Sequence, residues 1–310
     1  MSSPAATQSA AAPASAGRGS RASVHRLRAS QRRWGIAFAL PVIVLELALL
    51  GLPMLQAVYY SFTNWDGLTS TWIGLANYQR LFADSTFWRV MLNNVFLLLS
   101  IPVAIAIPLA VAYLLNERVM GWRVFRSAYF LPTAISWVVI GMVAVRFFAN
   151  KGILNSLLAP LGLHVDLLSG ELSAMLAVII TFIWSVFGTN TIIFITGMAT
   201  LDRDIYEAAR VDGAGSIATF WRITIPMLMR FIQFAFILTL ITAFTALFSL
   251  IFVMTGGGPG YGTTTLEFYV YQTAFAQGEF GYAAAVGVVL FVIVFGISII
   301  QLRLFRDRSD

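Results

Sequence analysis

Long apolar runs alternate with short polar segments along most of the chain. A helix needs about 20 apolar residues to cross the roughly 30 Å hydrocarbon core of a bilayer. Six stretches meet this requirement, at residues 34–60, 90–115, 127–145, 172–198, 231–254 and 280–302. The pattern therefore predicts an all-α membrane protein with six transmembrane helices.

The composition supports a membrane protein. Of the 310 residues, 59% are hydrophobic and only 11% are charged, whereas about a quarter of the residues in ordinary soluble domains are charged. This balance excludes a soluble globular enzyme. The chain has no Cys and two His, too few for a disulfide framework or a zinc site. We therefore expect no catalytic residue, no metal and no cofactor in this chain.

The polar ends of the chain predict the domain boundaries. Residues 1–33 are rich in Ala, Ser and Pro and lack apolar periodicity, so they cannot bury enough surface to offset the entropy of ordering. The apolar run that follows is too long for a signal peptide and has no small-residue cleavage site. We predict a disordered cytoplasmic tail over 1–33, a six-helix membrane domain over 34–302 and a cytoplasmic tail over 303–310.

The basic residues predict the orientation in the membrane. If the N-terminus is cytoplasmic, only Arg80, Arg89, Arg146 and Lys151 of the 20 basic residues fall on the outer side. Cytoplasmic loops carry an excess of Lys and Arg, so both termini are expected inside the cell. A basic tail can also bind lipid or nucleic acid. No aromatic residues are interleaved with its arginines, and we expect no nucleic-acid partner.

The inner segment over residues 201–226 has the pattern of two short helices joined by a turn. Asp204 and Glu207 stand three residues apart near its start, as in a capping arrangement at a helix N-terminus. Gly213 accepts a positive φ and ends the first helix. Ser216 can cap a second helix that runs into Pro226. We predict that this pair of helices lies on the cytoplasmic face.

The same segment resembles the EAA loop of the membrane subunits of binding-protein-dependent ABC importers. The resemblance rests on the triplet 207–209, on Gly213 and on the run from Ile223 to Pro226, with Ile225 where Leu is commoner. It implies the ABC importer permease fold with a cytoplasmic EAA-type coupling helix. The residues that it assigns to ATPase coupling are Glu207, Ala208, Ala209, Asp212, Gly213 and Pro226.

The resemblance also implies where the energy for transport comes from. The chain has no G-x-x-x-x-G-K-[ST] sequence, which is the phosphate-binding loop of many ATPases. ATP and Mg²⁺ are therefore expected on partner ATPase subunits, and Glu207 is expected to pair with a basic group of such a subunit. Truncating Glu207 or Gly213 should uncouple transport without unfolding the membrane domain.

A second stretch, FVMTGGGPGYGTTTLEFYVYQTAF from Phe252, resembles the outer loop of carbohydrate importers of the maltose and glycerol-phosphate class. Its glycine run lacks the Lys and the helix of a phosphate cradle, so we interpret it as a flexible outer turn. The resemblance implies contact with an extracytoplasmic solute-binding protein. The residues expected in this contact are Gly257, Gly258, Pro259 and Tyr269, and residues 77–88 are expected to contribute.

Together the two resemblances imply a complete importer in the bacterial plasma (inner) membrane. The chain would be one of two homologous permease subunits that are surrounded by membrane lipid. Its other expected partners are two ATPase subunits, a solute-binding protein and a carbohydrate substrate. The sequence leaves open which sugar or polyol is carried, and whether the substrate site lies in this subunit or in the second permease.

Polar side chains within the predicted spans indicate where a solute passes, because such residues are costly in hydrocarbon unless they face a cavity or a partner. Neutral hydrogen-bonding groups beside an aromatic ring suit a sugar. By resemblance, Trp184 is expected to be a sugar-stacking aromatic. The predicted substrate path consists of Trp184, Asn190, Thr239, Thr242, Thr245 and Ser249. Equally, these Thr and Ser residues can bond to their own helix or join neighbouring helices.

Glu46 is the only charged residue within the six predicted spans, and it supports an alternative function. A proton-coupled secondary transporter would use a carboxylate at membrane depth. The two halves of the sequence show no repeat of the kind that such transporters often have. An intramembrane enzyme is disfavoured because the chain contains neither H-E-x-x-H nor G-x-S-x-G.

Overall fold

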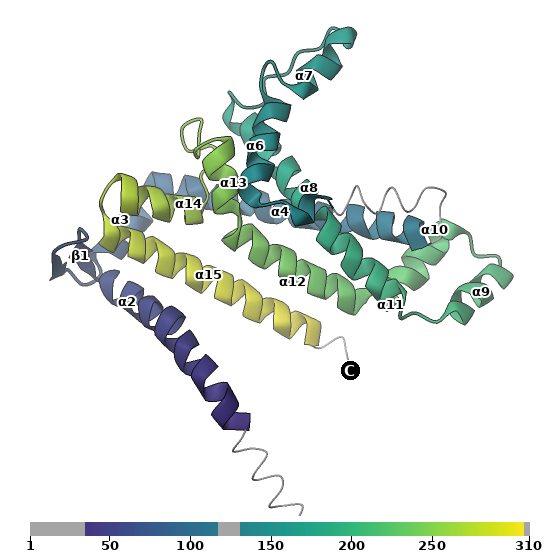
Figure 1. The fold of residues 1–310 in the computed structure, drawn as a ribbon, viewed down its shortest axis with the longest axis horizontal. Coiled ribbons are helices and arrows are strands. Elements are labelled where there is room, and N and C mark those ends of the chain that lie inside the picture. The colour runs from purple at the N-terminus through teal and green to yellow at the C-terminus, as the bar shows by residue number, and fades with distance from the viewer. Residues whose placement is uncertain (1–34, 117–130, 307–310) are drawn as a thin grey trace, which may run out of the picture. The chain divides into compact units, whose positions relative to one another are not determined.

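The computed structural model describes residues 35–116 and 131–306, and within these ranges the regular secondary structure is helical apart from one short hairpin (Figure 1). Five helices are long and apolar enough to span a membrane: Gly35–Tyr60, Ser85–Leu115, Trp137–Leu161, Glu171–Met198 and Phe280–Gln301. A sixth candidate consists of Ser216–Met227 and Met229–Thr245, which meet at an angle of 72°. The predicted all-α membrane architecture is confirmed.

Two compact units divide the chain, residues 1–56 and residues 57–310. The described part of the first unit is helical and contains a wide turn, η1 (Leu47–Gly51), which is followed by α2 (Leu52–Tyr60). Pro53 has no N–H and its ring crowds the carbonyl one turn before it, which accounts for the wide turn. Glu46 stands directly before this turn. The predicted tail over 1–33 lies outside the described residues.

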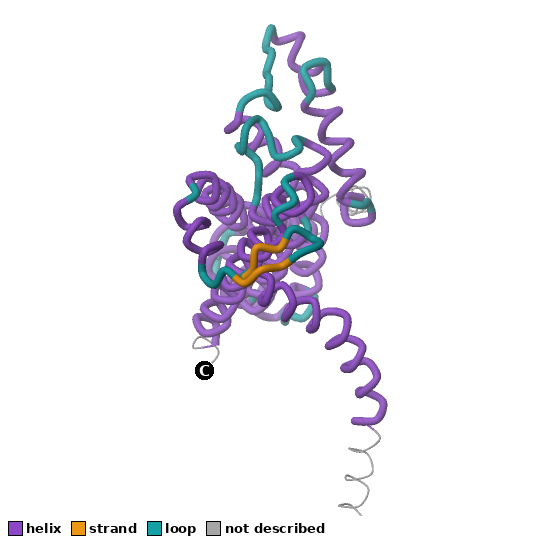
Figure 2. Tube along the Cα trace, turned by 90° about the vertical axis from the view of Figure 1, so that its left-hand side faces the viewer, coloured by secondary structure: helices purple, strands orange, loops and turns teal. Residues whose placement is uncertain are grey.

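The second unit begins with a hairpin that the sequence pattern did not predict. Strand β1 (Thr63–Trp65) pairs antiparallel with β2 (Ser70–Trp72), with Thr63 opposite Trp72 (Figure 2). The Asp66 carboxylate accepts hydrogen bonds from the backbone N–H groups of Leu68 and Thr69 and so closes the turn. The segment after the first span is therefore folded rather than a simple loop.

Helices α4 (Ser85–Asn116) and α8 (Glu171–Met198) form the centre of the second unit, together with α12 (Met229–Thr245). Their facing sides bury large apolar side chains such as Leu97, Phe182 and Leu240. Gly197 on α8 allows close packing, because a Cβ at this position would lie 2.7 Å from the Phe231 ring. Small residues bring membrane helices together in this way.

Two predicted spans have different boundaries in the structure. The third was expected over 127–145, of which 127–130 lie outside the described residues. A short turn, η2 (Leu131–Ala134), comes first, and α6 (Trp137–Phe148) begins only after Ser136, whose side chain accepts a hydrogen bond from the Val139 N–H. Helix α7 (Ile153–Leu158) and the turn η3 (Ala159–Leu161) follow. The third span therefore begins later than predicted.

The fifth predicted span, 231–254, is not one continuous helix. Helix α12 ends at Thr245, and α13 (Leu247–Met254) begins after Ala246, whose φ of −117° and ψ of −7° interrupt the regular turn. A partly buried loop, α14 (Leu266–Tyr271), η5 (Gln272–Ala276) and α15 (Phe280–Arg306) complete the unit. Helix α15 runs four residues beyond the predicted end of the last span, and residues 307–310 lie outside the described residues.

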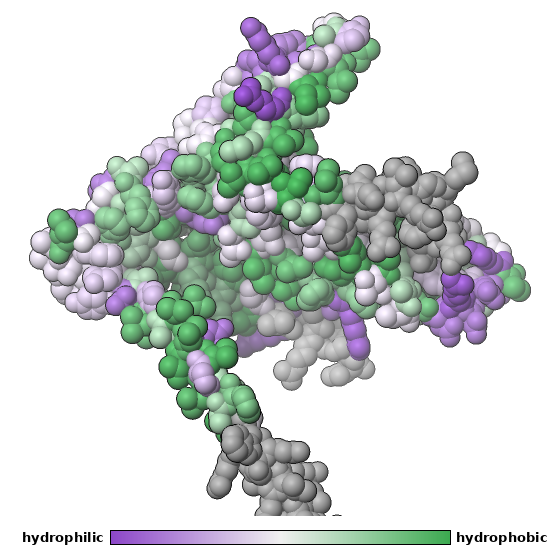
Figure 3. Space-filling view, in the orientation of Figure 1, coloured by the Kyte–Doolittle hydropathy of each residue, from purple (hydrophilic) through white to green (hydrophobic). Residues whose placement is uncertain are grey.

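Opposite ends of the second unit hold its two polar regions. Figure 1 shows α9 (Arg203–Val211), α10 (Ser216–Thr219) and α11 (Ile225–Met227) at one end, and β1 and α3 (Ala76–Ala83) at the other. In Figure 3 hydrophilic residues gather at the end with α9, and hydrophobic residues are spread over the helices between the ends. This distribution suits a unit that crosses a bilayer.

Candidate functional site

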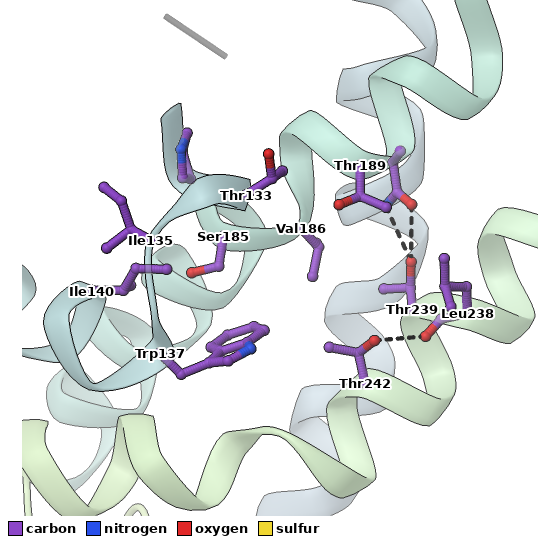
Figure 4. Close-up of a pocket in the computed structure, with 12 residues that line it drawn as sticks. Thr133, Ile135, Trp137, Ile140, Ser185, Val186, Thr189, Leu238, Thr239 and Thr242 are labelled. Atoms are coloured by element: carbon purple, nitrogen blue, oxygen red, sulfur yellow. Dashed lines mark hydrogen bonds between the residues drawn. The ribbon is translucent and has the colours of Figure 1, made fainter. Parts of the chain in front are cut away.

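A cavity of about 240 Å³ lies between α6, α8, α12 and the turn η2 (Figure 4). Its polar lining consists of hydroxyl groups and one amide: Thr133, Ser185, Thr189, Asn190, Thr239 and Thr242. None of the described residues that line it carries a formal charge. Nor do three His, Cys, Asp or Glu side chains gather anywhere in the described ranges. The cavity is therefore suited to a neutral polar ligand.

Trp137 supplies the aromatic surface of this cavity. Its indole ring lies below Ser185 in Figure 4, on the opposite side of the cavity from Thr242, and it stacks on Phe182 with ring centroids 6.4 Å apart. Sequence reasoning did not select Trp137. The available signal was Ser136, because a Ser cap places the next residue in the first turn of a helix.

The structure does not bring Trp184 into this cavity. Adjacent residues of an α-helix differ by about 100° in direction, so Trp184 lies on a different side of α8 from Ser185. It lies in a separate apolar depression of about 400 Å³, together with Val143 and Phe147. Trp184 and Asn190 therefore line different hollows in this structure, and the path predicted through both stays a prediction.

Asn190 joins three helices in addition to lining the cavity. Pro108 lacks the N–H that would bond the Ala104 carbonyl within α4. The Asn190 side-chain amide donates to this carbonyl oxygen at 3.0 Å and to Thr239 Oγ1 at 3.1 Å. All of these groups are buried. The Asn190–Thr239 pair therefore serves as interhelical contact, the alternative that the sequence left open.

The remaining polar residues of α12 and α13 do not share one face. Thr242 lines the cavity and donates to the Leu238 carbonyl, which leaves its oxygen free to accept a further hydrogen bond. Thr245 is exposed and donates to the Ile241 carbonyl. Ser249 lies beyond the break at Ala246, on α13. Only Thr239 and Thr242 of the four predicted residues line the cavity, because the helix ends sooner than the sequence indicates.

The predicted helix pair on the inner segment is present, with its caps shifted. Asp202 caps α9 by accepting a hydrogen bond from the Asp204 N–H at 3.1 Å, so Asp204 lies in the first turn instead. Gly215 precedes α10, where Ser216 was expected as the cap. Pro226 lies in α11 and is exposed. The positions of both helices were predicted within a few residues, but their caps were not.

Gly213 has a φ of +77°, as its role in a turn requires. The Ala214 N–H bonds the Ala209 carbonyl at 2.9 Å and closes the end of α9. Ala209 is buried, whereas Glu207, Ala208 and Asp212 are exposed. The Tyr113 hydroxyl of α4 donates to the Ser216 carbonyl at 3.1 Å and fixes the second helix. These hydrogen bonds fix the end of α9 and the start of α10, while one face of α9 remains exposed.

Large apolar side chains are exposed on this inner element. Val211 is 88% exposed, Ile217 78% and Trp221 65%. They stand beside charged residues of α9, including Glu207 and Arg210. A mixed apolar and charged surface of this kind is typical of a site for another protein.

The outer glycine-rich turn is closely hydrogen-bonded. Thr264 Oγ1 donates to the Gly257 carbonyl at 2.8 Å, and Thr263 Oγ1 donates to the Gly258 carbonyl at 2.9 Å. Gly257 has a φ of +86° and is buried, and a Cβ there would lie 2.6 Å from Thr264 Oγ1. Gly258 and Pro259 remain partly exposed. The interpretation as a flexible turn misses these threonine bonds.

Tyr269 does not lie on the outer surface where it was predicted. Its side chain is 4% exposed, and its hydroxyl donates to Asp84 Oδ2 at 2.9 Å. Tyr282 donates to the same oxygen at 3.1 Å. Burial acts to raise the pKa of Asp84, but the hydrogen bonds from the Thr86 N–H and the two tyrosines outweigh it and hold the pKa below its ordinary value. Tyr269 therefore joins α14 to the start of α4.

Replacing Asp84 with Asn tests this contact. An acid with a lowered pKa in the folded state stabilises the fold above its unfolded pKa of about 3.9 and loses this contribution as the pH falls through the folded value. We expect the wild type to melt at a higher temperature than Asp84→Asn from about pH 5 upward, with the difference shrinking below about pH 4. Thermal unfolding across this range measures it. A difference that does not change with pH would exclude a contribution from the charge.

Known proteins resemble this chain over most of its length. The family model described as "Binding-protein-dependent transport system inner membrane component" matches residues 83–309. The permease protein MsmF of a multiple sugar-binding transport system of Streptococcus mutans is 34% identical over 88% of this chain and 95% of its own length. The arabinooligosaccharides permease AraP of Halalkalibacterium halodurans is 31% identical over 85% of each chain.

A solved structure shares the fold. It is a bacterial alginate ABC transporter in complex with an alginate pentasaccharide-bound periplasmic protein. One of its chains superposes with a TM-score of 0.80 at 24% identity and covers 92% of this chain and 99% of its own length.

Proposed function

The chain belongs to the family of inner membrane components of binding-protein-dependent transport systems, and on this premise we propose that it is one permease subunit of an ATP-driven carbohydrate importer. The family consists of transport permeases, so the chain is a multi-pass membrane protein and not an enzyme. The similarity to MsmF and AraP, whose names specify sugars, supports a carbohydrate substrate.

The cavity beside Trp137 is the main structural observation that supports a carbohydrate as the substrate. Sugars present many hydroxyl groups and apolar ring faces, and the cavity offers neutral hydrogen-bonding groups next to an indole ring. Its volume of about 240 Å³ lies below the range of about 300–1,000 Å³ that is usual for complete ligand pockets. We assign this chain one wall of the path, and a second homologous permease completes it.

The inner element is assigned to the ATPase subunits. Glu207 and Ala208 are exposed on α9, and Val211 and Ile217 add apolar surface without a partner among the described residues. Two ATPase subunits that bind ATP and Mg²⁺ would receive this surface and its copy on the second permease. Buried Ala209 and the turn at Gly213 hold α9 in place, and Asp212 and Pro226 are exposed beside this surface.

The outer turn is assigned to a solute-binding protein. Gly258 and Pro259 are partly exposed, and the buried threonines beneath them fix their backbone. The alginate transporter, which was solved with its periplasmic protein bound, supports such a partner. The excess of arginine on the same side as the inner segment supports a cytoplasmic location for both termini.

Reconstitution of the complete importer, with both permeases, the ATPase subunits and the binding protein, in proteoliposomes tests the proposal. We expect accumulation of a labelled sugar that requires ATP and the binding protein and survives a proton ionophore. Trp137→Ala should raise the substrate concentration for half-maximal transport about tenfold, because one stacking contact is worth about 1.4 kcal/mol at most. Trp184→Ala is the matched control, since this second Trp lies outside the cavity, and it should transport normally.

Two results would contradict these assignments. Uptake that persists without ATP and stops on adding the ionophore would favour a proton-coupled carrier that uses Glu46. A stronger defect in Trp184→Ala than in Trp137→Ala would move the substrate path to the other side of α8.

A further inference from the structure

The break between α12 and α13 leaves a helix N-terminus without a local cap. Ala246 precedes α13 and has no side chain that can accept a hydrogen bond. The first N–H groups of any helix lack partners within the helix. Glu267 on α14, nineteen residues after Phe248, fills this role, because its Oε2 accepts a hydrogen bond from the Phe248 N–H at 3.1 Å.

The surroundings of Glu267 are unfavourable for a charged group. Phe248 lies 5.7 Å from Phe268 and 5.0 Å from Tyr271, measured between ring centroids, so aromatic rings gather where the carboxylate binds. Burial raises the pKa of Glu267 to about 7, although the hydrogen bond from Phe248 acts to lower it. Glu267 thus changes its charge near neutral pH, and the Phe248 N–H is the only hydrogen-bond donor to it among the described residues.

No charged neighbour compensates for this burial. The elements that pack on α13 and α14 are α4, α6, α8, α12, α15 and η5. Among the side chains that the structure describes, the other ionisable groups of all these elements are Arg89, Tyr113, Arg146, Glu171, Arg230, Tyr269, Tyr271, Tyr282 and Arg303. None of these groups is hydrogen-bonded to Glu267 or paired with it.

Stability does not explain an acid at this position. When an acid has a folded pKa above its unfolded value, the folded state loses stability as the pH rises from the unfolded pKa of about 4.3 towards the folded one. A neutral Gln would accept the same hydrogen bond without this cost. A carboxylate at a helix N-terminus, however, bonds the N–H more strongly and also interacts with the helix dipole.

The bond connects two regions that have separate roles. Thr242 lies one turn before the break and lines the cavity. Glu267 lies on α14, directly after the buried threonines that hold the outer turn at Gly257. The start of α13, directly after the end of α12, is therefore joined to α14 by this hydrogen bond.

We propose that Glu267 is a positioning residue whose carboxylate caps α13 and fixes the break after α12, so that the placement of the outer turn sets the placement of Thr242 in the cavity wall. This inference rests on the proposed function of the cavity. When a binding protein docks on the outer turn, Glu267 would pass the resulting displacement on to Thr242 in the wall of the cavity.

Hydrogen exchange of the assembled importer in lipid nanodiscs tests the cap itself. In Glu267→Leu the amides at the start of α13 should exchange about tenfold faster than in the wild type, because the Phe248 N–H loses its acceptor. Glu267→Gln should remain protected, and the amides of α4 and α8 should not change. Glu279→Gln is the matched control, because this acid pairs with Arg80 and does not touch α13.

Transport at pH 6 and pH 8 tests the positioning role. Ionised Glu267 binds the Phe248 N–H more strongly, so the wild-type rate relative to that of Glu267→Gln should fall about threefold as the pH drops through about 7, and Glu279→Gln should follow the wild type. Glu267→Gln should lose this dependence and match the slower, low-pH rate, although it melts at a higher temperature than the wild type at pH 8. Glu267→Leu should be slower at both pH values. If Glu267 had only a structural role, the variant with the higher melting temperature at pH 8 would not be the one with the slower transport.

Three outcomes would overturn the inference. They are unchanged exchange in Glu267→Leu, wild-type transport in Glu267→Leu despite faster exchange, or equal pH profiles for the wild type and Glu267→Gln. If the wild type moves no carbohydrate, the proposed function fails instead, while hydrogen exchange still reports on the cap.

Discussion

Replacing Glu207 with Ala should remove nearly all ATP-driven transport while leaving the membrane domain folded. The side chain is exposed and makes no hydrogen bond or ion pair with any described residue, so its loss costs the fold little. Removing one member of a charged pair at a protein interface costs about 2–5 kcal/mol. We therefore expect coupling to the ATPase to weaken about a hundredfold, as measured by transport per ATP hydrolysed and by co-purification of the ATPase.

Asp204→Ala is the control for this result. Asp204 also lies on α9 and is exposed, and its removal changes the net charge of the helix by the same amount. The only expected loss is a contribution of about 0.3–1 kcal/mol from the helix dipole. If both variants transport equally well, Glu207 does not contact the ATPase. If Glu207→Ala unfolds on purification, its role lies within the chain.

The largest effect on stability is expected from Asn190→Leu. This change leaves the Ala104 carbonyl and the Thr239 hydroxyl buried without their partner. Each unsatisfied group costs about 1–3 kcal/mol, so we expect a loss of about 2–4 kcal/mol in the free energy of unfolding. Denaturation of the chain in mixed micelles, followed by circular dichroism, measures it.

A double variant separates the cause of this loss from a simple packing defect. Pro108→Ala restores an N–H that can bond the Ala104 carbonyl within α4. Combined with Asn190→Leu, it should recover part of the lost stability, because one of the two orphaned groups regains a partner. If the double variant loses as much stability as Asn190→Leu alone, the stabilising effect of Asn190 does not come from its hydrogen bond to the Ala104 carbonyl.

Features that depend on local sequence were predicted well. The apolar runs gave the membrane helices, since the length of a span is a property of the segment itself. Gly213 gave the turn after α9, because glycine adopts its positive φ at little cost. The caps of α9 and α10 were misplaced by one or two residues because Asp202, Asp204, Gly215 and Ser216 are all acceptable caps.

Features that depend on distant contacts were not predicted. Nothing around Ala246 breaks a helix, and the acid that caps the next helix stands nineteen residues after Phe248. The hairpin at 63–72 has strands of three residues, too short for an alternating pattern to show. The choice of Trp137 over Trp184 for the cavity depends on how α6 packs against α8, which the pattern of one helix does not reveal.

The 72° bend at Leu228 lets a small tilt beside the inner segment (residues 201–226) become a larger displacement at the far end of α12. Leu228 is fully buried, so it provides a fixed pivot between α11 and α12. Helix α12 has 17 residues and is therefore about 25 Å long. A tilt of about 10° at this pivot would displace its far end, next to Thr242, by about 4 Å. Small tilts beside residues 201–226 would thus become movements as large as a side chain in the wall of the cavity.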